Sequence, residues 1–198
     1  MSSALPESDP ALPTFDARWH YSALDAADNT AVAAYEESLF EAFAPILKIN
    51  PLVRNLWDWD DPQRRLRTRV PYADQFVALM RDAQTGAIAF SVGVNLHPGR
   101  FWQSGAYGFP VPAVDEHACE FLIMASGEAN RANGAAIMRH FIRDYFFNEL
   151  RRRGFWCAYG TSADHLRWLY RRVGAAIAAE NMVDGFRRTL FRWDLSKE

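Results

Sequence analysis

The spacing of hydrophobic residues in the first half of the chain predicts a helix followed by a β-hairpin. Between residues 28 and 43 apolar side chains recur every three or four positions, as on one face of a helix, and Asn29 or Thr30 would cap it. Two apolar runs with strand character follow at 75–81 and 87–96. A polar turn that ends on glycine separates these runs, so we expect them to pair with each other.

The second half alternates strands and helices. A strand is expected at 119–125, and a helix that ends at Arg153 carries five large apolar residues on one face. Residues 57–62 and 97–116 have the composition of loops. The remaining expected elements are a strand at 155–159, a short helix at 163–173, and strands at 175–180 and 188–193.

This order of elements predicts the fold class. We expect one α/β (α+β) domain over residues 14–198, after a flexible tail at 1–13 that holds three prolines.

Composition indicates a globular protein without a membrane span. Of the 198 residues 49% are hydrophobic and 23% are charged, and no apolar run approaches the roughly 18 residues that a span needs. No secretory signal is apparent at the N-terminus. Cys119 and Cys157 lack metal-ligand spacing, so we expect buried thiols in a reducing compartment, no metal, and a cytoplasmic location.

Charge is distributed unevenly along the chain. Residues 1–61 hold eleven acidic and three basic side chains, whereas residues 131–192 hold twelve arginines and five acids. The basic part would favour an anionic cofactor or an acidic carrier protein. The arginines come without a recognisable nucleic-acid module, so no nucleic-acid partner is expected. The acidic part would suit a cationic acceptor, although a solvated acidic face explains it better.

A candidate phosphate site lies between the strand at 119–125 and the long helix. The first N–H groups of a helix have no intrahelical partner, and the helix dipole favours an anion there. Gly134 would let the backbone approach a bulky anion, and Arg131 adds a positive charge. An ordinary helix start is the alternative. The proposed loop, suited to the pyrophosphate of coenzyme A, consists of Arg131, Ala132, Asn133, Gly134, Ala135 and Ala136.

The element order, this loop and the ending Leu169-Tyr170 four residues before Gly174 resemble the GNAT superfamily of acyltransferases over roughly residues 30–195. The resemblance implies a mixed, mostly antiparallel twisted sheet flanked by helices, in which the strands at 119–125 and 155–159 lie side by side and then splay apart. It implies an N-acyltransferase that moves an acetyl or longer acyl group from acyl-CoA to an amine in a ternary complex. It implies that Tyr170 protonates the leaving thiolate. It also implies that the backbone of Met124, Ala125 and Ser126 contacts the pantetheine and holds the oxyanion.

The general base and the acceptor are less sharply indicated. A base would take a proton from the attacking amine, and residues at the start of the 119–125 strand could do so. We assign this role first to Glu120 and second to His117, with Glu116 as a further candidate. For each of them, a plain solvated residue is the alternative. Aromatic side chains that could line the substrate pocket, or merely cover the core, are Trp57, Trp59, Phe101, Trp102 and Tyr107.

Several functional alternatives stay open at this point. The acceptor could be a small molecule or a peptide amine, and a homodimer is compatible with the sequence. A more distant likeness connects the chain to N-acyl amino acid and acyl-homoserine-lactone synthases, whose acyl donor is acyl carrier protein. A non-catalytic domain that keeps the fold to bind acyl-CoA or a partner is the rival from another functional class.

Overall fold

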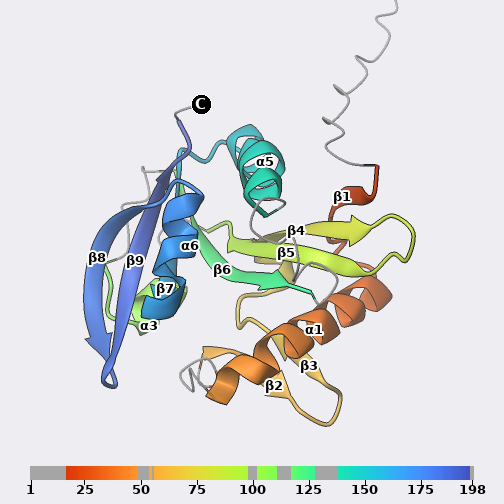
Figure 1. Cartoon of the computed structure of the whole chain (residues 1–198), viewed down its shortest axis with the longest axis horizontal. Helices are drawn as coiled ribbons and strands as arrows, with labels where there is room; N and C mark the ends of the chain where they lie inside the picture. The colour runs from red at the N-terminus through yellow and green to blue at the C-terminus, as the bar shows by residue number, and fades with distance from the viewer. Residues whose placement is uncertain are drawn as a thin grey trace, which may run out of the picture.

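A computed structural model describes residues 17–48, 54, 56–97, 102–110, 117–127 and 138–196 of the chain. Seven strands form one sheet in the order β1-β4-β5-β6-β7-β9-β8, shown in Figure 1. Among the strands of the described residues, only β6 and β7 pair in parallel, so the expected mixed, mostly antiparallel sheet is confirmed. The strands are β1 (Trp19–Ala23), β4 (Gln75–Asp82), β5 (Ile88–Asn95), β6 (Ala118–Ser126), β7 (Cys157–Ala163), β8 (Ala176–Val183) and β9 (Phe186–Asp194).

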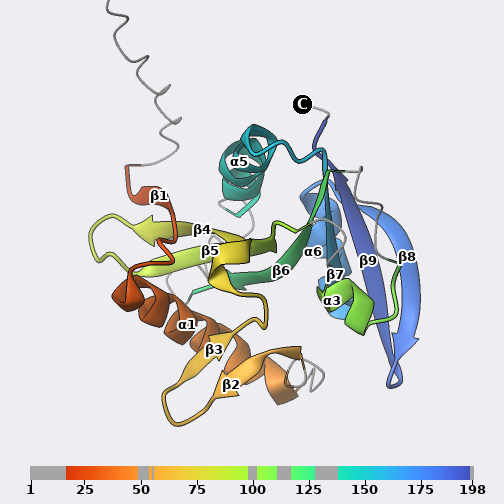
Figure 2. The same cartoon turned by 180° about the vertical axis from the view of Figure 1, so that it is seen from behind.

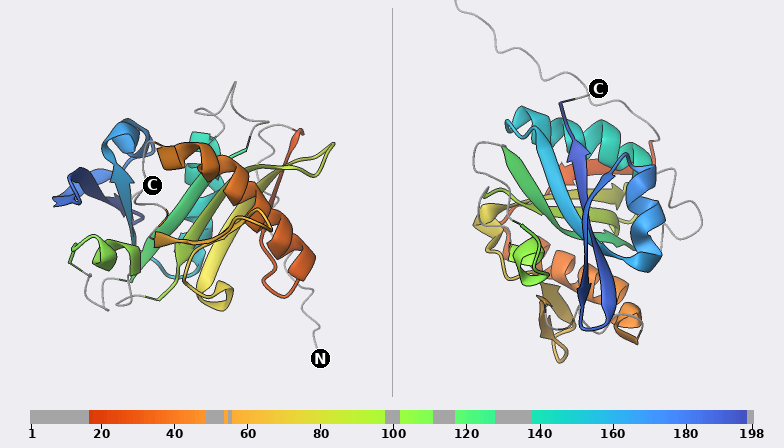
Figure 3. Two further views of the ribbon diagram at one scale, coloured as in Figure 1. Left: turned by 90° about the horizontal axis from the view of Figure 1, so that it is seen from below. Right: turned by 90° about the vertical axis from the view of Figure 1, so that its left-hand side faces the viewer.

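Helices cover both faces of this sheet. Helix α1 and the β2–β3 hairpin lie against one face, and α5 and α6 lie against the other, as Figures 1 and 3 show. Seen from behind in Figure 2, the short helix α3 lies beside β7. These elements are α1 (Asn29–Phe43), η1 (Ala44–Lys48), β2 (Asp58–Asp60), β3 (Arg65–Arg67), η2 (Tyr72–Asp74), α3 (Trp102–Ala106), η5 (Phe141–Phe146), α5 (Phe147–Arg152), η6 (Asp164–Leu166) and α6 (Arg167–Arg172).

Alternating side chains on the strands build a separate core on each face. Phe121 of β6 packs against Phe146 and Trp193 on the α5 side, with ring centroids 5.3 and 4.5 Å away. Leu122 and Leu190 belong to the core beneath α1. The expected buried face of the long helix is confirmed, because Met138, Phe141, Ile142, Tyr145 and Phe146 are all buried.

Strands β6 and β7 separate partway along their length. They pair from Ala118 to Phe121 and from Cys157 to Gly160, although β6 continues for five residues and β7 for three. A Cβ on Gly160 would lie 3.0 Å from the Cβ of Phe121, so the last pair is tightly packed. Next to it Leu122 has no partner on β5, because the register of that pairing shifts there. The expected splay is therefore confirmed, and a bulge accompanies it.

The structure corrects several boundaries. Asp28, not Asn29 or Thr30, caps α1, since its carboxylate accepts the N–H groups of Thr30 and Ala31. The segment 57–62 contains strand β2 rather than only a loop, and helix α3 lies within the expected loop 97–116. Strand β7 spans 157–163 rather than 155–159. Gly154 and Gly174 follow the expected ends of the two helices, and their φ of 84° and 91° is the left-handed conformation typical of a glycine that ends a helix.

Candidate active site

A small cavity of about 70 Å³ lies where β6 and β7 separate. That volume equals roughly two water molecules, so the cavity holds only the reacting ends of larger ligands. Strand β6 contributes Leu122, Ile123 and Met124, and β7 contributes Thr161, Ser162 and Ala163. The other lining residues are Phe43, Leu56, Trp57, Gln103, Tyr107, Leu166, Tyr170 and Arg188.

The cavity has a wall on each face of the sheet. Leu166 and Tyr170 belong to the core on the α5 and α6 side. Trp57 and Tyr107 belong to the core on the α1 side, and Gln103 approaches from α3. Because β6 and β7 are not paired here, the opening connects the two faces. Two ligands that enter from opposite faces could therefore meet inside it.

Tyr170 contributes a hydroxyl group to the α6 side of the cavity. The hydroxyl donates to the carbonyl oxygen of Thr161 over 3.5 Å, which is a weak hydrogen bond. Its ring stacks on Phe191, with centroids 5.1 Å apart. Burial raises the pKa of Tyr170 to about 12, and the nearby Tyr107 adds to the shift. At neutral pH the hydroxyl is therefore protonated and able to donate a proton.

Glu120 is buried beside the opening, one pair before the strands separate. None of its side chain is exposed, and its Oε1 accepts the backbone N–H of Ser104 over 2.6 Å. The carboxylate thus holds helix α3 against β6. Glu120 does not line the cavity, so the sequence-based assignment as general base gains no support from its position.

His117 lies at the other end of β6. It is exposed, its φ is 47°, and its ring lies against that of Trp156, with centroids 4.4 Å apart and the planes tilted by 36°. Met124 lies seven positions further along the chain, which is about 23 Å of extended strand. The structure therefore does not bring His117 to the opening. Glu116 lies outside the described residues.

The expected aromatic pocket is only partly assembled at the cavity. Trp57 and Tyr107 line it. Trp59 instead packs edge-on against Phe40, with centroids 5.7 Å apart, on the β2–β3 hairpin. Phe101 and the side chain of Trp102 lie outside the described residues.

Two polar residues at the cavity were not singled out from the sequence. Gln103 donates from Nε2 to the Thr161 hydroxyl over 3.0 Å, across 58 positions of the chain. Arg188 of β9 is 3% exposed, and its guanidinium lies 5.0 Å from the centre of the Tyr107 ring. Neither belongs to a recognisable local motif, so only the folded chain reveals their position.

The candidate phosphate loop, Arg131 to Ala136, lies outside the described residues. The described part of the helix after it runs from Met138 and packs on the same face of the sheet as Tyr170. Met124 lines the cavity, and β6 continues through Ala125 and Ser126 beyond its pairing with β7.

Both cysteines are buried thiols, as expected, and they form no disulfide with each other. Cys119 donates weakly to the carbonyl oxygen of Cys157, at 3.8 Å. Burial raises the pKa of the Cys119 thiol well above its usual range. A thiol in this interior thus stays protonated, which argues against Cys119 as a nucleophile.

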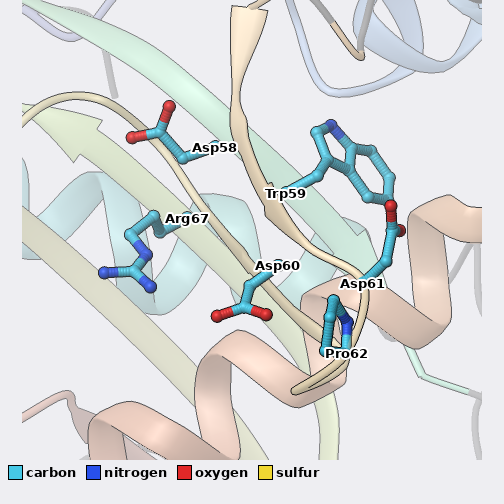
Figure 4. A pocket seen from close by; sticks show the side chains of 6 residues that line it. All are labelled: Asp58, Trp59, Asp60, Asp61, Pro62 and Arg67. Atoms are coloured by element: carbon cyan, nitrogen blue, oxygen red, sulfur yellow. The ribbon is translucent and has the colours of Figure 1, made fainter.

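A second hollow, of about 350 Å³, lies on the β2–β3 hairpin. Figure 4 shows Asp58, Asp60 and Asp61 around it, with Arg67 between two of them. Each carboxylate is engaged: Asp58 with Arg69 at 3.1 Å, Asp60 with the N–H of Gln63, and Asp61 with Arg54. These acids belong to the outer hairpin and do not line the cavity between β6 and β7.

Over the described ranges, no helix is long and apolar enough to cross a membrane. The same residues contain no group of three or more His, Cys, Asp or Glu side chains that could hold a metal ion.

Comparison with known proteins rests on structure alone. No protein-family model matches the sequence, and no curated protein is similar enough in sequence to match it.

Solved structures with similar folds include two kinds of protein. TofI, solved with an inhibitor and MTA, is 18% identical, with a TM-score of 0.64 over 90% of this chain and 91% of that one. BjaI, a CoA-dependent acyl-homoserine lactone synthase solved with SAM and isopentyl-CoA, is 9% identical, with a TM-score of 0.63 over 88% and 82%.

A putative acetyltransferase of the GNAT family from Desulfovibrio desulfuricans is 12% identical, with a TM-score of 0.55 over 89% of this chain and 99% of that one. At these identities the similarity concerns the fold. Together with the splayed parallel pair, it shows that the chain has the fold of the GNAT superfamily.

Proposed function

We propose that the chain is an N-acyltransferase that moves an acyl group from the thioester of acyl-CoA to an amine in the opening between β6 and β7. The observation that carries the proposal is the buried, protonated hydroxyl of Tyr170 inside a cavity that joins the two faces of the sheet. Thioester and amine could approach from opposite faces and react directly. No covalent intermediate on the protein is needed.

The proposed reaction balances without a further reagent. The amine nitrogen forms a bond to the acyl carbon while the carbon–sulfur bond breaks. The thiolate takes the proton of the Tyr170 hydroxyl, and the tyrosinate regains a proton that the new amide nitrogen loses. The products are one amide and one free thiol.

The relative acidity of the two groups supports proton transfer from Tyr170. A thiol in water has a pKa near 8.5, about 3.5 units below Tyr170, so transfer to a solvated thiolate would cost about 5 kcal/mol. A thiolate confined in the cavity loses solvation, however, and burial raises thiol pKa values in this protein, as Cys119 illustrates. The two pKa values therefore approach each other in a dry site.

The donor side is proposed from both sequence and fold. The amides of residues 131–136 would hold the pyrophosphate, and the unpaired edge of β6 at Met124, Ala125 and Ser126 would hold the pantetheine and the oxyanion. BjaI is described as CoA-dependent, which supports a CoA thioester as donor here. Acyl carrier protein is the alternative donor.

The proposal is tested by offering the purified chain acetyl-CoA, longer acyl-CoA or acylated carrier protein together with a panel of amines. We expect free thiol to appear only with an amine present, and mass spectrometry to detect the matching amide. Faster turnover of the carrier-protein thioester would support the synthase-like alternative. Absence of amide with every donor and amine would overturn the enzyme proposal and leave a binding module.

A further inference from the structure

The α1 side of the cavity carries a buried acceptor atom that no group of the described residues satisfies. The amide oxygen Oε1 of Gln103 lines the cavity and has no hydrogen-bond partner, although the residue is only 7% exposed. The indole Nε1 of Trp57, a donor on a residue 5% exposed at the same cavity, is unpaired as well. Buried polar groups are nearly always paired, so these two atoms indicate polar groups of a ligand.

Hydrogen bonds to both separated strands fix the Gln103 amide at the opening. Its Nε2 donates to the Thr161 hydroxyl of β7 over 3.0 Å, so the amide nitrogen is engaged and Oε1 is the atom left open. The next residue, Ser104, donates its backbone N–H to Glu120 of β6 over 2.6 Å. Helix α3 therefore bridges β6 and β7 where they separate, and the fold sets the position of the open acceptor.

The two open atoms match the two reacting groups of an acyl transfer. A neutral amine brings an N–H that the Gln103 oxygen accepts, and a thioester brings a carbonyl oxygen that suits the Trp57 N–H. The cavity of about 70 Å³ has to enclose only these groups, because the rest of each ligand stays outside it. The nucleophile is thus met by an amide oxygen and not by a carboxylate.

The groups around the cavity do not remove a proton from an ammonium ion at neutral pH. The Gln103 amide is neutral, and the ionisable side chains among the described lining residues are those of Tyr107, Tyr170 and Arg188. Burial raises the pKa of both tyrosines, so they stay protonated, and the guanidinium stays charged. Glu120 packs against α3, but its carboxylate is bonded there and does not line the cavity.

We propose that Gln103 receives the attacking nitrogen through its Oε1, and that the acceptor is a weakly basic amine, one with a substantial neutral fraction at physiological pH. The α-amine of a peptide, with a pKa near 8, is about one third neutral at about pH 7.5, whereas a lysine-type amine is about 0.1% neutral. The inference rests on the proposed acyl transfer, in which the new amide nitrogen gives its proton to the Tyr170 oxygen. It specifies the substrate class as α-amines, aromatic amines or hydrazines.

The test varies the basicity of the amine at nearly constant size. Ethylamine, 2-fluoroethylamine and 2,2,2-trifluoroethylamine become less basic in that order. Thiol release, corrected for the rate without protein, gives kcat/KM from about pH 7 to about pH 10. For trifluoroethylamine, which is already neutral, we expect a flat profile. For ethylamine we expect a rise of about tenfold per pH unit, as its neutral fraction rises.

Two variants tie this behaviour to Gln103. Gln103→Met keeps an unbranched side chain and removes the acceptor, so kcat/KM for every amine should fall about tenfold while KM for acyl-CoA stays unchanged. Gln103→Glu keeps the shape and adds a carboxylate that pairs with an ammonium ion and takes its proton. At about pH 7 this variant should therefore favour ethylamine over trifluoroethylamine about tenfold more than the unchanged chain does.

A matched control separates the amide from the packing of its helix. Asn181 of β8 donates to the carbonyl oxygen of Tyr107, just after α3, over 2.8 Å and does not line the cavity. Asn181→Ala loosens the same segment without changing the Gln103 amide, and should leave kcat/KM for each amine unchanged. If it lowers kcat/KM as much as Gln103→Met does, the loss follows the packing of α3 and the assignment of Gln103 fails.

The outcomes also separate this inference from the proposed function. If all three amines share one midpoint in their pH profiles, a protein group takes the proton, so the inference is wrong and the transferase proposal stands. The inference is equally wrong if the profile of trifluoroethylamine rises steeply with pH. If no amine yields an amide with any donor, the proposed function itself fails.

Discussion

Replacing Tyr170 by phenylalanine should remove activity and leave the fold intact. The hydroxyl makes one long hydrogen bond of 3.5 Å, so its loss should cost less than about 1 kcal/mol of unfolding free energy. The ring keeps its stacking on Phe191 and its contact with Trp193, at 5.1 and 5.4 Å between centroids. The thermal midpoint should therefore shift by no more than about 4 °C.

The effect on turnover should be much larger. Loss of a general acid typically lowers rates about 10²- to 10⁴-fold, equivalent to about 3–5 kcal/mol in the activation barrier. Steady-state thiol release at saturating amine would measure kcat, and titration with acyl-CoA should give a nearly unchanged KM. Because the expected catalytic loss exceeds the expected stability loss several-fold, the two effects can be told apart.

A second buried tyrosine supplies the control. Tyr145 stacks on Tyr21 with centroids 5.3 Å apart and does not line the cavity, so Tyr145→Phe should keep full turnover. The reasoning about Tyr170 would be refuted if Tyr170→Phe retained kcat within a factor of about two at neutral pH. It would also be refuted if both variants lost activity equally, because the loss would then follow packing and not the hydroxyl.

Three further predictions concern the strands and the titration of Tyr170. Gly160→Ala would place a Cβ 3.0 Å from the Cβ of Phe121, so thermal melts should show an unfolding free energy lower by about 1–3 kcal/mol. Gly105→Ala is the control, because a Cβ at Gly105 has no atom within 4 Å and should not lower the stability. Glu120→Ala leaves the N–H of Ser104 in α3 without its acceptor and should lower the unfolding free energy by about 1–3 kcal/mol. Glu120→Gln keeps an acceptor oxygen, so both stability and turnover should be retained. A selective loss of kcat in Glu120→Gln would restore Glu120 as the general base. Because the pKa of Tyr170 is raised to about 12, kcat should show no alkaline decline below about pH 11, and a fall in kcat near pH 9 would contradict the acid role. The stability that comes from keeping this phenol neutral should be present below about pH 10 and lost between about pH 10 and 12.

The parts of the fold that the sequence predicts are those with strong local signals. The helix that starts near residue 28, the hairpin of β4 and β5, and the glycine helix ends all follow from periodicity and turn chemistry. Strand β7 was placed two residues early and too short, because its second half is Gly-Thr-Ser-Ala and lacks the apolar side chains that mark a strand.

Other features depend on contacts between distant parts of the chain. Helix α3 has five residues, one of them glycine, and its N–H at Ser104 bonds Glu120, 16 positions away. Such a segment has no helical signal of its own. Strand β1 was likewise missed, since five residues of mixed polarity become a strand only through pairing with β4.

Some residues of the candidate site could be predicted from the sequence, and others could not. Tyr170 could be singled out because Leu169-Tyr170, four residues before Gly174, resembles the ending of this helix in the GNAT superfamily, and the structure places Tyr170 in the cavity. Gln103 and Arg188 could not, because each is an isolated polar residue whose role depends on Thr161 or Tyr107 far along the chain. His117 and Glu120 were singled out because they stand near the start of a strand in the sequence. The fold does not bring the side chain of either residue into the opening.

The central claim is that the opening between β6 and β7 is where a thioester reacts. An experimental structure of the chain with a non-hydrolysable acyl-CoA analogue would test it most directly. The account predicts that the atom that replaces the thioester sulfur lies between Met124 and Thr161, within hydrogen-bond distance of the Tyr170 hydroxyl, about 3.5 Å or less. It also predicts that the pyrophosphate lies on the amides of residues 131–136. An analogue bound elsewhere, such as in the arginine-lined groove of Arg143 and Arg171 beside Gly174, with the opening empty, would contradict it.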